Sequence, residues 1–368
     1  MQAVILVGGE GTRLRPLTST IPKPVVALVD RPMMAYMLEW LHGHGVDDVI
    51  MSCGFKATKV REVLGDGSQY GIRLRFLEEP DPRGTAGALK FAEELLDERF
   101  LMLNGDVLTD LDLTAQIAQH ERTGATGTLA LVPVPDPSSY GLVRLREDHA
   151  VDEFLEKPSP DAVLDTNLIS AGAYVLERSV LDLIEPDKKV SIEHEVWPVL
   201  VDRGLYGFAD DSAYWIDVGT PERYLQATFD ILEGNVRTGV AGKLGESYVS
   251  VDPSTQLAGR AIPPAIVGAG CTIAEGAHVG SLAVLAGGVG VGSGSVVERA
   301  VVLQGARIGD DCVLRDCIVG PGASIGDRSR VTGGAMLGEG VMIGADNVIA
   351  HGARLFPGLE VPDGGLVF

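Results

Sequence analysis

Glycines and cations are concentrated near the N-terminus in an arrangement that suits a polyphosphate. An apolar run over residues 4–7 leads into a glycine-rich stretch, residues 8–11, and Arg13, Arg15 and Lys23 follow. Glycines let backbone N–H groups approach phosphate oxygens because no Cβ stands in the way. We expect the next helix to turn its positive N-terminal end toward the same anion. The stretch therefore predicts a triphosphate site.

Three other interpretations of the glycine-rich stretch have to be weighed. In the first, the glycines serve only a tight turn after a strand. A dinucleotide fingerprint begins at Gly9 and Gly11, and Asp30 lies about 20 residues on, but Leu14 occupies its third glycine position. A Walker motif is absent, because Pro24 follows Lys23.

Two carboxylates stand where a metal-assisted phosphoryl reaction needs them. Asp106 follows a predicted strand over 100–104, and Asp217 follows an apolar run over 214–216. In nucleotidyl transfer a phosphate oxygen attacks the α-phosphorus of a triphosphate, and both partners are anions. Mg²⁺ held by one or two carboxylates and the phosphates suits that reaction. The alternative is that each aspartate only caps a helix or turn.

A second group of polar residues suits a phosphorylated sugar. Glu156 and Lys157 end a predicted strand, so the carboxylate can accept from sugar hydroxyls and the ammonium can hold a phosphate. Gly141 and Gly172 would let the sugar approach the backbone closely, and Asn167 would bind its hydroxyls. An exposed Glu-Lys pair alone is common and is not diagnostic.

The elements that must position these residues follow a βα pattern up to about residue 235. Strands are predicted at 3–7, 49–52, 74–77, 100–103 and 128–133, with amphipathic helices at 33–42 and 86–96. This alternation predicts a parallel sheet covered by helices, in which ligands collect at the carboxyl ends of the strands.

Beyond Pro263 the period changes to six residues. Aliphatic side chains occupy every sixth position, with a slip of one residue after Val297 and another after Leu314. The series is Val267, Ile273, Val279, Leu285, Val291, Val297, Val302, Ile308, Leu314, Val319, Ile325, Val331, Leu337, Ile343, Ile349 and Leu355. Such hexads are typical of a parallel β-helix, whose inward residues recur once on each side of a coil.

Composition limits the classes of partner. The chain has 368 residues and a formal net charge of -21, which disfavours nucleic acid and anionic membrane surfaces. It has no apolar run of about 18 residues and no signal segment. The four cysteines lack metal-site spacing and are predicted to be free thiols. We expect a cytoplasmic enzyme with no membrane or nucleic-acid partner.

Taken in order, the motifs resemble those of the sugar-1-phosphate nucleotidyltransferases, and within them most nearly the mannose-1-phosphate guanylyltransferases. The matching segments are residues 8–24, 84–88, 104–106, 154–158, 167–174, 191–193 and 215–221. The resemblance implies a Rossmann-like α/β catalytic domain (1–235) with a mixed, mostly parallel sheet, a linker (236–262) and a left-handed parallel β-helix (263–368). It also implies a homo-oligomer joined through the β-helix.

The resemblance implies a role for each matching position. Nucleotide-binding residues would be Leu6, Gly8, Gly9, Gly11, Thr12, Glu79, Gly84 and Thr85. Arg13, Lys23, Asp106, Lys157 and Asp217 would be catalytic, with Arg13 and Lys23 on the departing pyrophosphate and Asp106 and Asp217 on Mg²⁺. Gly141, Glu156, Lys157, Asn167 and Gly172 would bind the hexose 1-phosphate.

Glu79 favours GTP among the nucleotides. Relatives that bind uracil or thymine resemble one another in having glutamine five residues before the glycine at position 84. An ionised glutamate only accepts hydrogen bonds, which suits the adjacent N1–H and N2–H₂ donors of guanine. Facing uracil it would meet a carbonyl oxygen, a mismatch that costs about 1–3 kcal/mol. The carboxylate turned to solvent is the alternative.

Other functions stay open at this stage. A glucose-1-phosphate thymidylyl- or uridylyltransferase shares most of the motifs. A bifunctional nucleotidyl- and acyltransferase would use His278 or His351 in the hexad region as a base. A non-catalytic regulatory subunit that binds a nucleotide-sugar would have less need for two metal carboxylates.

Overall fold

The computed structural model describes residues 1–54, 56–159 and 165–367, which form two compact units. The first unit comprises Met1–Gly9 and Met34–Trp215, and the second comprises Glu10–Met33 and Ile216–Phe368. The glycine-rich stretch is therefore divided between them. We call Glu10–Met33 the loop segment.

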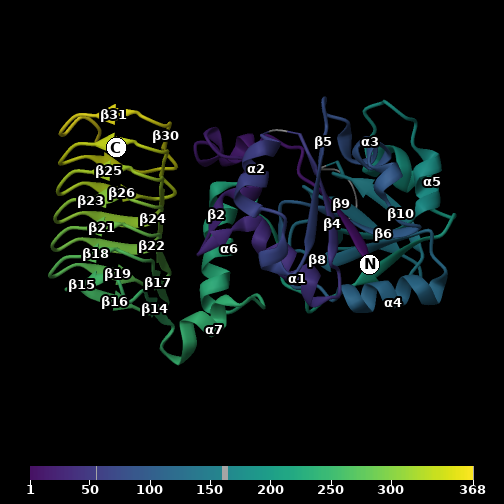
Figure 1. Ribbon diagram of the computed structural model, residues 1–368, viewed down its shortest axis with the longest axis horizontal. Coiled ribbons are helices and arrows are strands. Elements are labelled where there is room, and N and C mark those ends of the chain that lie inside the picture. The colour runs from purple at the N-terminus through teal and green to yellow at the C-terminus, as the bar shows by residue number, and fades with distance from the viewer. Residues whose placement is uncertain (55, 160–164, 368) are drawn as a thin grey trace. The chain divides into compact units, whose positions relative to one another are not determined.

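A nine-stranded mixed sheet forms the first unit (Figure 1). Four parallel strands lie in the order β6-β1-β4-β5, and β11 continues the sheet antiparallel to β6. Their bounds are β1 (Gln2–Leu6), β4 (Asp48–Cys53), β5 (Arg73–Glu78), β6 (Arg99–Asn104), β8 (Gly127–Pro133), β9 (Gly141–Leu145), β10 (Val151–Glu156), β11 (Leu168–Glu177) and β12 (Leu205–Ala209). The predicted Rossmann-like domain with a mixed sheet is confirmed: four strand pairings are parallel, and β9 and β11 make four antiparallel ones.

Helices flank this sheet and enclose one of its apolar faces. They are α1 (Met33–Gly43), α2 (Ala57–Leu64), α3 (Gly84–Phe91), α4 (Leu113–Thr123) and α5 (Trp197–Leu200), with short helical turns at Ser68–Tyr70, Glu93–Leu95, Arg178–Leu183 and Ile192–Val196. Val4, Phe100 and Trp197 are fully buried in one core cluster. A small pair, β7 (Val107–Thr109) and β13 (Trp215–Asp217), stands apart from the main sheet.

The helix expected directly after the glycine-rich stretch does not form. Residues Thr12–Leu14, Leu17–Ser19 and Lys23–Val25 make single 3₁₀ turns, followed by the short pair β2 (Ala27–Leu28) and β3 (Arg31–Pro32). Pro16, Pro22 and Pro24 explain the difference, because each lacks an N–H and disfavours a helical residue before it. No helix N-terminus therefore supports the anion here.

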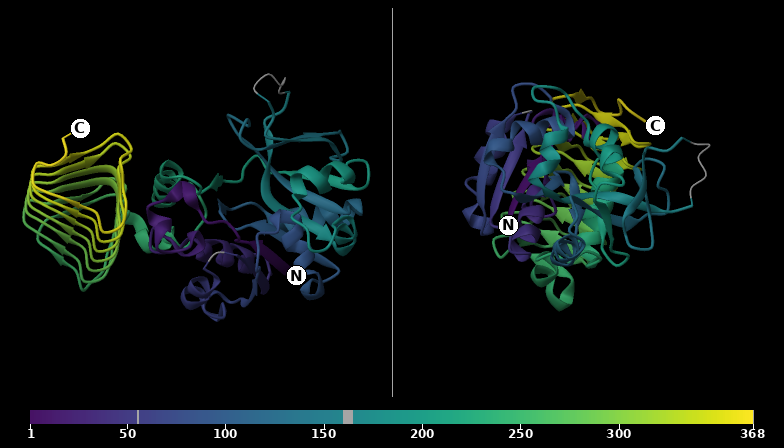
Figure 2. Two further views of the ribbon diagram at one scale, coloured as in Figure 1. Left: turned by 90° about the horizontal axis from the view of Figure 1, so that it is seen from above. Right: turned by 90° about the vertical axis from the view of Figure 1, so that its right-hand side faces the viewer.

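In the second unit the hexads wind into a parallel β-helix with three faces. Ala265 pairs with Ala283 and Met336 with Arg354, so one coil takes eighteen residues, or three hexads. Figure 1 shows the coils from the side, and the left view of Figure 2 looks along their stack. Every predicted hexad position is buried in a single core, which confirms the period.

The strands of each face pair in parallel from coil to coil. One face holds β14 (Val249–Val251), β17 (Ala265–Val267), β20 (Ala283–Leu285), β27 (Met336–Leu337) and β30 (Arg354–Leu355). Another holds β16 (Arg260–Ile262), β19 (His278–Gly280), β26 (Arg330–Thr332) and β29 (Val348–Ile349), and both share β22 (Val296–Val302) and β24 (Val313–Val319). The third holds β15 (Gln256–Leu257), β18 (Thr272–Ile273), β21 (Gly290–Val291), β23 (Arg307–Ile308), β25 (Ser324–Ile325), β28 (Met342–Ile343) and β31 (Glu360–Val361).

Each one-residue slip in the hexads is a shortened corner. The slips fall inside β22 and β24, which run from one face to the next. Arg299 and Asp316 occupy these corners in left-handed backbone conformations, with φ of 48° and 47°. Their side chains pair across neighbouring coils at 2.6 Å. The two slips coincide in space because the corners stack.

The segment 236–262, expected to be a linker, has regular structure instead. It follows α6 (Pro221–Glu233) and contains α7 (Val240–Leu244), a 3₁₀ turn at Gly245–Ser247, and the strands β14, β15 and β16. Val249 pairs with Ala265 and Gln256 with Thr272, so the first coil begins at Val249. This coil escaped prediction because Val251 and Leu257 are six residues apart, but ten residues separate Leu257 from Val267 and break the period.

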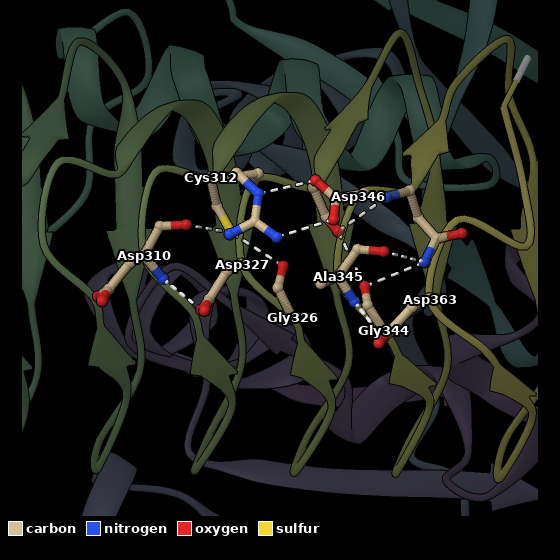
Figure 3. A network of polar contacts seen from close by, with 11 residues as sticks. Asp310, Cys312, Gly326, Asp327, Gly344, Ala345, Asp346 and Asp363 are labelled. Carbon is tan, nitrogen blue, oxygen red and sulfur yellow. Dashed lines mark hydrogen bonds and ion pairs between the residues drawn. The ribbon is translucent and has the colours of Figure 1, made fainter.

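Polar groups close the corners and one end of the β-helix. The Asp310 N–H donates to Asp327 at 2.9 Å, and the Ala345 N–H donates to Asp363 at 2.8 Å (Figure 3). Asn347 is fully buried and donates to three carbonyls at 2.9–3.1 Å, while its oxygen accepts from the Leu366 N–H. It joins the chain end to the preceding coil.

Two further expectations can be compared with the structure. The four cysteines are buried free thiols, as predicted, and burial raises the pKa of Cys53 to about 12. Among the residues that the structure describes, no helix has the length and hydropathy that a membrane crossing requires.

Replacing Asn347 with alanine should loosen the end of the β-helix. The change removes the buried amide that serves the Leu366 N–H and three carbonyls, so we expect the free energy of unfolding to fall by about 2–4 kcal/mol. Urea denaturation followed by circular dichroism measures it. Glu339→Ala, an exposed corner substitution, is the control and should change stability by less than about 0.5 kcal/mol. A loss below about 1 kcal/mol for Asn347→Ala would contradict the role assigned to the amide.

Candidate active site

The ends of β1 and β6 place the first two parts of the site side by side. The Gly105 N–H donates to the Leu6 carbonyl at 3.0 Å. A Cβ on Gly105 would lie 2.4 Å from Val7 Cγ1, so only glycine lets β6 turn here. Gly8 and Asp106 therefore follow neighbouring parallel strands, as the sequence predicts.

Glu79 lies beside the glycine-rich stretch and is held there. Its Oε1 accepts a hydrogen bond from Ser52 Oγ at 2.7 Å and is 3.8 Å from the position that a Cβ on Gly8 would take. The backbone N–H of Glu79 donates to Cys53 O at 2.8 Å. Sequence reasoning missed Ser52, because a serine in a buried strand carries no local signal of such a contact.

Gly84 and Thr85 connect α3 to the segment 190–193. Gly84 has a φ of 72°, and a Cβ there would lie 2.5 Å from Val190 O. Thr85 Oγ1 donates to Glu193 Oε2 at 2.8 Å and accepts from the Ile192 N–H at 2.8 Å. The hydroxyl thus joins two predicted motifs, and its contact with a nucleotide stays a prediction.

Gly141, Glu156 and Lys157 come together across the β9–β10 pair. Gly141 stands opposite Glu156, and a Cβ on it would lie 3.0 Å from Glu156 Oε2 and 2.6 Å from Phe154 Cζ. Lys157 is exposed in a left-handed conformation with φ of 47°, and its Nζ lies 3.5 Å from Glu156 Oε1. The absence of a side chain at Gly141 leaves the carboxylate accessible from that side.

Gly172 sits at a bulge in β11 beneath Asn104. Its φ is 75°, and a Cβ would lie 2.9 Å from Asn104 Nδ2. Next to it, Trp215 Nε1 donates to Ala171 O at 2.8 Å, and the indole meets the Tyr140 ring edge-on at 5.3 Å. Trp215 therefore links the Gly141 and Gly172 strands. Its only sequence signal was its position two residues before Asp217.

Asn167 is placed differently from the other predicted sugar ligands. It is exposed immediately before β11, and its carbonyl accepts from the Val134 N–H at 3.0 Å. Its role at the sugar stays a prediction.

In the second unit, the side chains of Arg13 and Asp217 both lie close to Gly219. A Cβ on Gly219 would lie 2.9 Å from Arg13 Nη2 and 3.1 Å from Asp217 Oδ2. Asp217 is half-buried and also forms an ion pair with Arg223. Gly219 thus makes room for a guanidinium beside a carboxylate, which the spacing of the residues in the sequence does not disclose.

Gly11 and Lys23 pack together at the base of the loop segment. Gly11 has a φ of 63°, and a Cβ there would lie 3.2 Å from Lys23 Cβ. Thr18 Oγ1 donates to Gly11 O at 2.7 Å. Lys23 is only 9% exposed, whereas Arg13 and Thr12 in the first 3₁₀ turn are exposed. The two predicted phosphate cations thus differ strongly in exposure.

Oxygen ligands for a metal come from few residues. Within residues 1–54, 56–159 and 165–367, no three His, Cys, Asp or Glu side chains gather closely enough to hold a metal ion by themselves.

His278 lies in β19 and His351 at a corner of the β-helix, whose hexads continue from 265 to 361 without a long insertion.

Two family models match the chain. The model described as "Nucleotidyl transferase" matches residues 2–234, and the one described as "GMPPB C-terminal domain" matches residues 261–363. A mannose-1-phosphate guanylyltransferase of Mycobacterium tuberculosis is 36% identical over 81% of this chain and 83% of its own length. A mannose-1-phosphate guanyltransferase of Candida albicans is 41% identical over 62% of this chain and 64% of its own length.

Solved structures match the first part of the chain. HddC from Yersinia pseudotuberculosis is 30% identical, with a TM-score of 0.54 over 61% of this chain and 97% of that chain. A second structure of the same protein, complexed with GMP-PN, gives a TM-score of 0.53 over the same shares.

Gly219→Ala should move the Arg13 guanidinium and weaken triphosphate binding. The new methyl would lie 2.9 Å from Nη2, closer than carbon and nitrogen approach without a shift. We expect the KM for the nucleoside triphosphate to rise about five- to twentyfold, the equivalent of about 1–2 kcal/mol. Gly239→Ala, where nothing lies within 4 Å of the added Cβ, is the control. The KM is measured by steady-state kinetics. If the two variants have the same KM for the nucleoside triphosphate, Gly219 has no role in triphosphate binding.

Proposed function

The chain belongs to the nucleotidyl transferase family, and we propose that it transfers the GMP group of GTP to mannose 1-phosphate, releasing pyrophosphate and forming GDP-mannose. The observation that carries the choice of nucleotide is Glu79, held by Ser52 next to Gly8. The names of the relatives support the choice of sugar.

The fixed cations of this site would act mainly by neutralising the phosphate charges of the two substrates. The attacking phosphate oxygen of the sugar is already ionised near neutral pH, so no general base is needed. Arg13 and Lys23 would neutralise the phosphates that leave, and Lys157 would hold the acceptor phosphate. Because Lys23 is buried, its charge is weakly screened by solvent and acts more strongly than an exposed one.

The Glu79 carboxylate suits guanine because it only accepts hydrogen bonds and is held beside the glycine-rich stretch. Ser52 Oγ donates to its Oε1, which restrains the side chain next to Gly8. An ionised carboxylate held in this way can accept from the N1–H and N2–H₂ groups of guanine. A uracil or thymine would present a carbonyl oxygen to the same acceptor, which costs about 1–3 kcal/mol.

The sugar pocket is proposed around Glu156 and the two glycines that adjoin the Tyr140–Trp215 ring pair. Gly141 leaves Glu156 accessible, and Gly172 leaves room beneath Asn104. A carboxylate with an amide nearby can bind vicinal hydroxyls of a hexose. Mannose is preferred over glucose because of the relatives' names, since these groups suit either sugar.

A divalent cation, proposed to be Mg²⁺, fits the residues present. Asp106 and Asp217 offer hard oxygen donors, and Mg²⁺ is usually held by one or two carboxylates together with substrate phosphates. The absence of a three-ligand cluster among the described residues agrees with such a site, which the substrate completes. When bound, the cation would neutralise charge on the α-phosphate and on the departing pyrophosphate.

Assembly into a homo-oligomer through the β-helix is proposed as well. Met342, Phe356 and Leu359 expose 42–50% of their surface near the end of the β-helix. The Met342 N–H donates to Leu359 O, so two of these side chains start from neighbouring coils. An apolar patch at that end suits contact with a second copy.

Pyrophosphate release across four nucleoside triphosphates and three hexose 1-phosphates tests the proposed reaction. We expect turnover to be fastest with GTP and mannose 1-phosphate and to stop on addition of excess EDTA, returning with Mg²⁺. Preference for UTP or dTTP would overturn the base assignment alone. Turnover with no combination would exclude the enzyme and favour a regulatory subunit.

Glu79→Gln tests the base assignment directly. A glutamine both donates and accepts, so the ratio of kcat/KM for GTP to that for UTP should fall about ten- to a hundredfold, the equivalent of about 1.4–2.8 kcal/mol. Glu78→Gln, its exposed neighbour that pairs with Arg61, is the matched control and should leave the ratio unchanged. An unchanged ratio in both variants would show that Glu79 faces solvent during turnover.

A further inference from the structure

Arg354 of the β-helix hydrogen-bonds to the loop segment. It is exposed in β30, and its Nη1 donates to Arg13 O at 3.0 Å and to Arg15 O at 3.4 Å. All three residues belong to the second unit. More than three hundred positions separate them in the sequence, so no local pattern could predict the contact.

The carbonyls of Arg13 and Arg15 are not acceptors in the hydrogen bonds of the first 3₁₀ turn. Within the turn, the Leu14 N–H donates to Gly11 O and the Arg15 N–H donates to Thr12 O. Pro16 follows and has no N–H to offer. Arg354 therefore supplies a charged donor to the end of the turn, and charged donors make stronger hydrogen bonds than neutral ones.

This contact bears directly on the Arg13 side chain. Arg354 holds the backbone carbonyl of Arg13, while Arg13 Nη2 lies 2.9 Å from the position that a Cβ on Gly219 would take. The backbone from which the Arg13 side chain extends is thus fixed by the β-helix. A cation that extends from a fixed backbone loses less freedom when it binds a phosphate.

Other anchors hold the far end of the loop segment. Tyr224 Oη donates to Ala27 O at 2.6 Å, and Lys243 Nζ donates to Asp30 at 3.0 Å. Both contacts lie more than ten residues beyond Arg13. Arg354 extends from the β-helix to the turn that directly follows the glycine-rich stretch.

We propose that Arg354 is a positioning residue for the phosphate-binding turn, through which the β-helix sets the Arg13 guanidinium for the pyrophosphate end of the nucleotide. The inference rests on the proposed function, because it assigns Arg13 to that end. It gives the β-helix a part in the reaction besides assembly.

Arg354→Ala in the full-length protein tests the proposal. We expect the KM for GTP, and for pyrophosphate in the reverse reaction, to rise about three- to tenfold, with the KM for mannose 1-phosphate within twofold. Arg354→Lys should recover part of the loss, since an ammonium can also donate to a carbonyl. Arg328→Ala is the matched control, because that arginine also donates two hydrogen bonds, but to Asp346 within the β-helix.

The outcomes separate this proposal from the proposed function. If wild type prefers another triphosphate, the function fails and the variants are compared with that nucleotide. If wild type turns over none, calorimetric binding of Mg²⁺–GTP to the same variants replaces the KM. The positioning role is overturned if Arg354→Ala and Arg328→Ala have the same KM for GTP. It is also overturned if Arg354→Ala raises the KM for GTP and the KM for mannose 1-phosphate equally. Arg354→Met, which keeps the apolar stem, replaces a variant that fails to fold.

Discussion

The loop segment carries two cations of the site but cannot hold its own shape. Its prolines and glycines allow only single 3₁₀ turns and the two-residue β2–β3 pair, so some of its backbone carbonyls take partners from elsewhere. Tyr224 of α6 and Arg354 of the β-helix donate to such carbonyls, and Lys243 of α7 pairs with the Asp30 side chain. The position of Arg13 therefore depends on residues far along the chain. This requirement ties the C-terminal half of the chain to the chemistry of the N-terminal half.

The remainder of the site is built by leaving side chains out. Gly105 lets β6 turn beside β1, Gly141 leaves the Glu156 carboxylate open, and Gly172 accommodates Asn104. At each of these positions a Cβ would lie 3.0 Å or less from a neighbouring atom. Glycine at each position therefore avoids a clash with the residues that line the proposed site.

The β-helix combines a repetitive interior with a few specific polar contacts. Its aliphatic core supplies the stability, and Asn347 and the corner aspartates satisfy backbone groups that the coils leave over. A stack of this kind deforms little, because each coil is hydrogen-bonded to the next along three faces. It offers a firm base for Arg354, which extends from β30 to the loop segment.

Local and periodic features were determined by the sequence alone. Five strands of the main sheet, the hexads and the two slips of one residue follow from side chains that repeat with the geometry of the backbone. Contacts between distant segments were decided only by the tertiary structure. Ser52 on Glu79, Trp215 on Ala171 and Arg354 on Arg13 leave no local pattern, because each joins residues whose separation is set by the folded chain. The missing helix after the glycine-rich stretch combines both kinds of feature. The prolines that prevent the helix can be read from the sequence, but the contacts that hold the segment in its place can be found only in the folded structure.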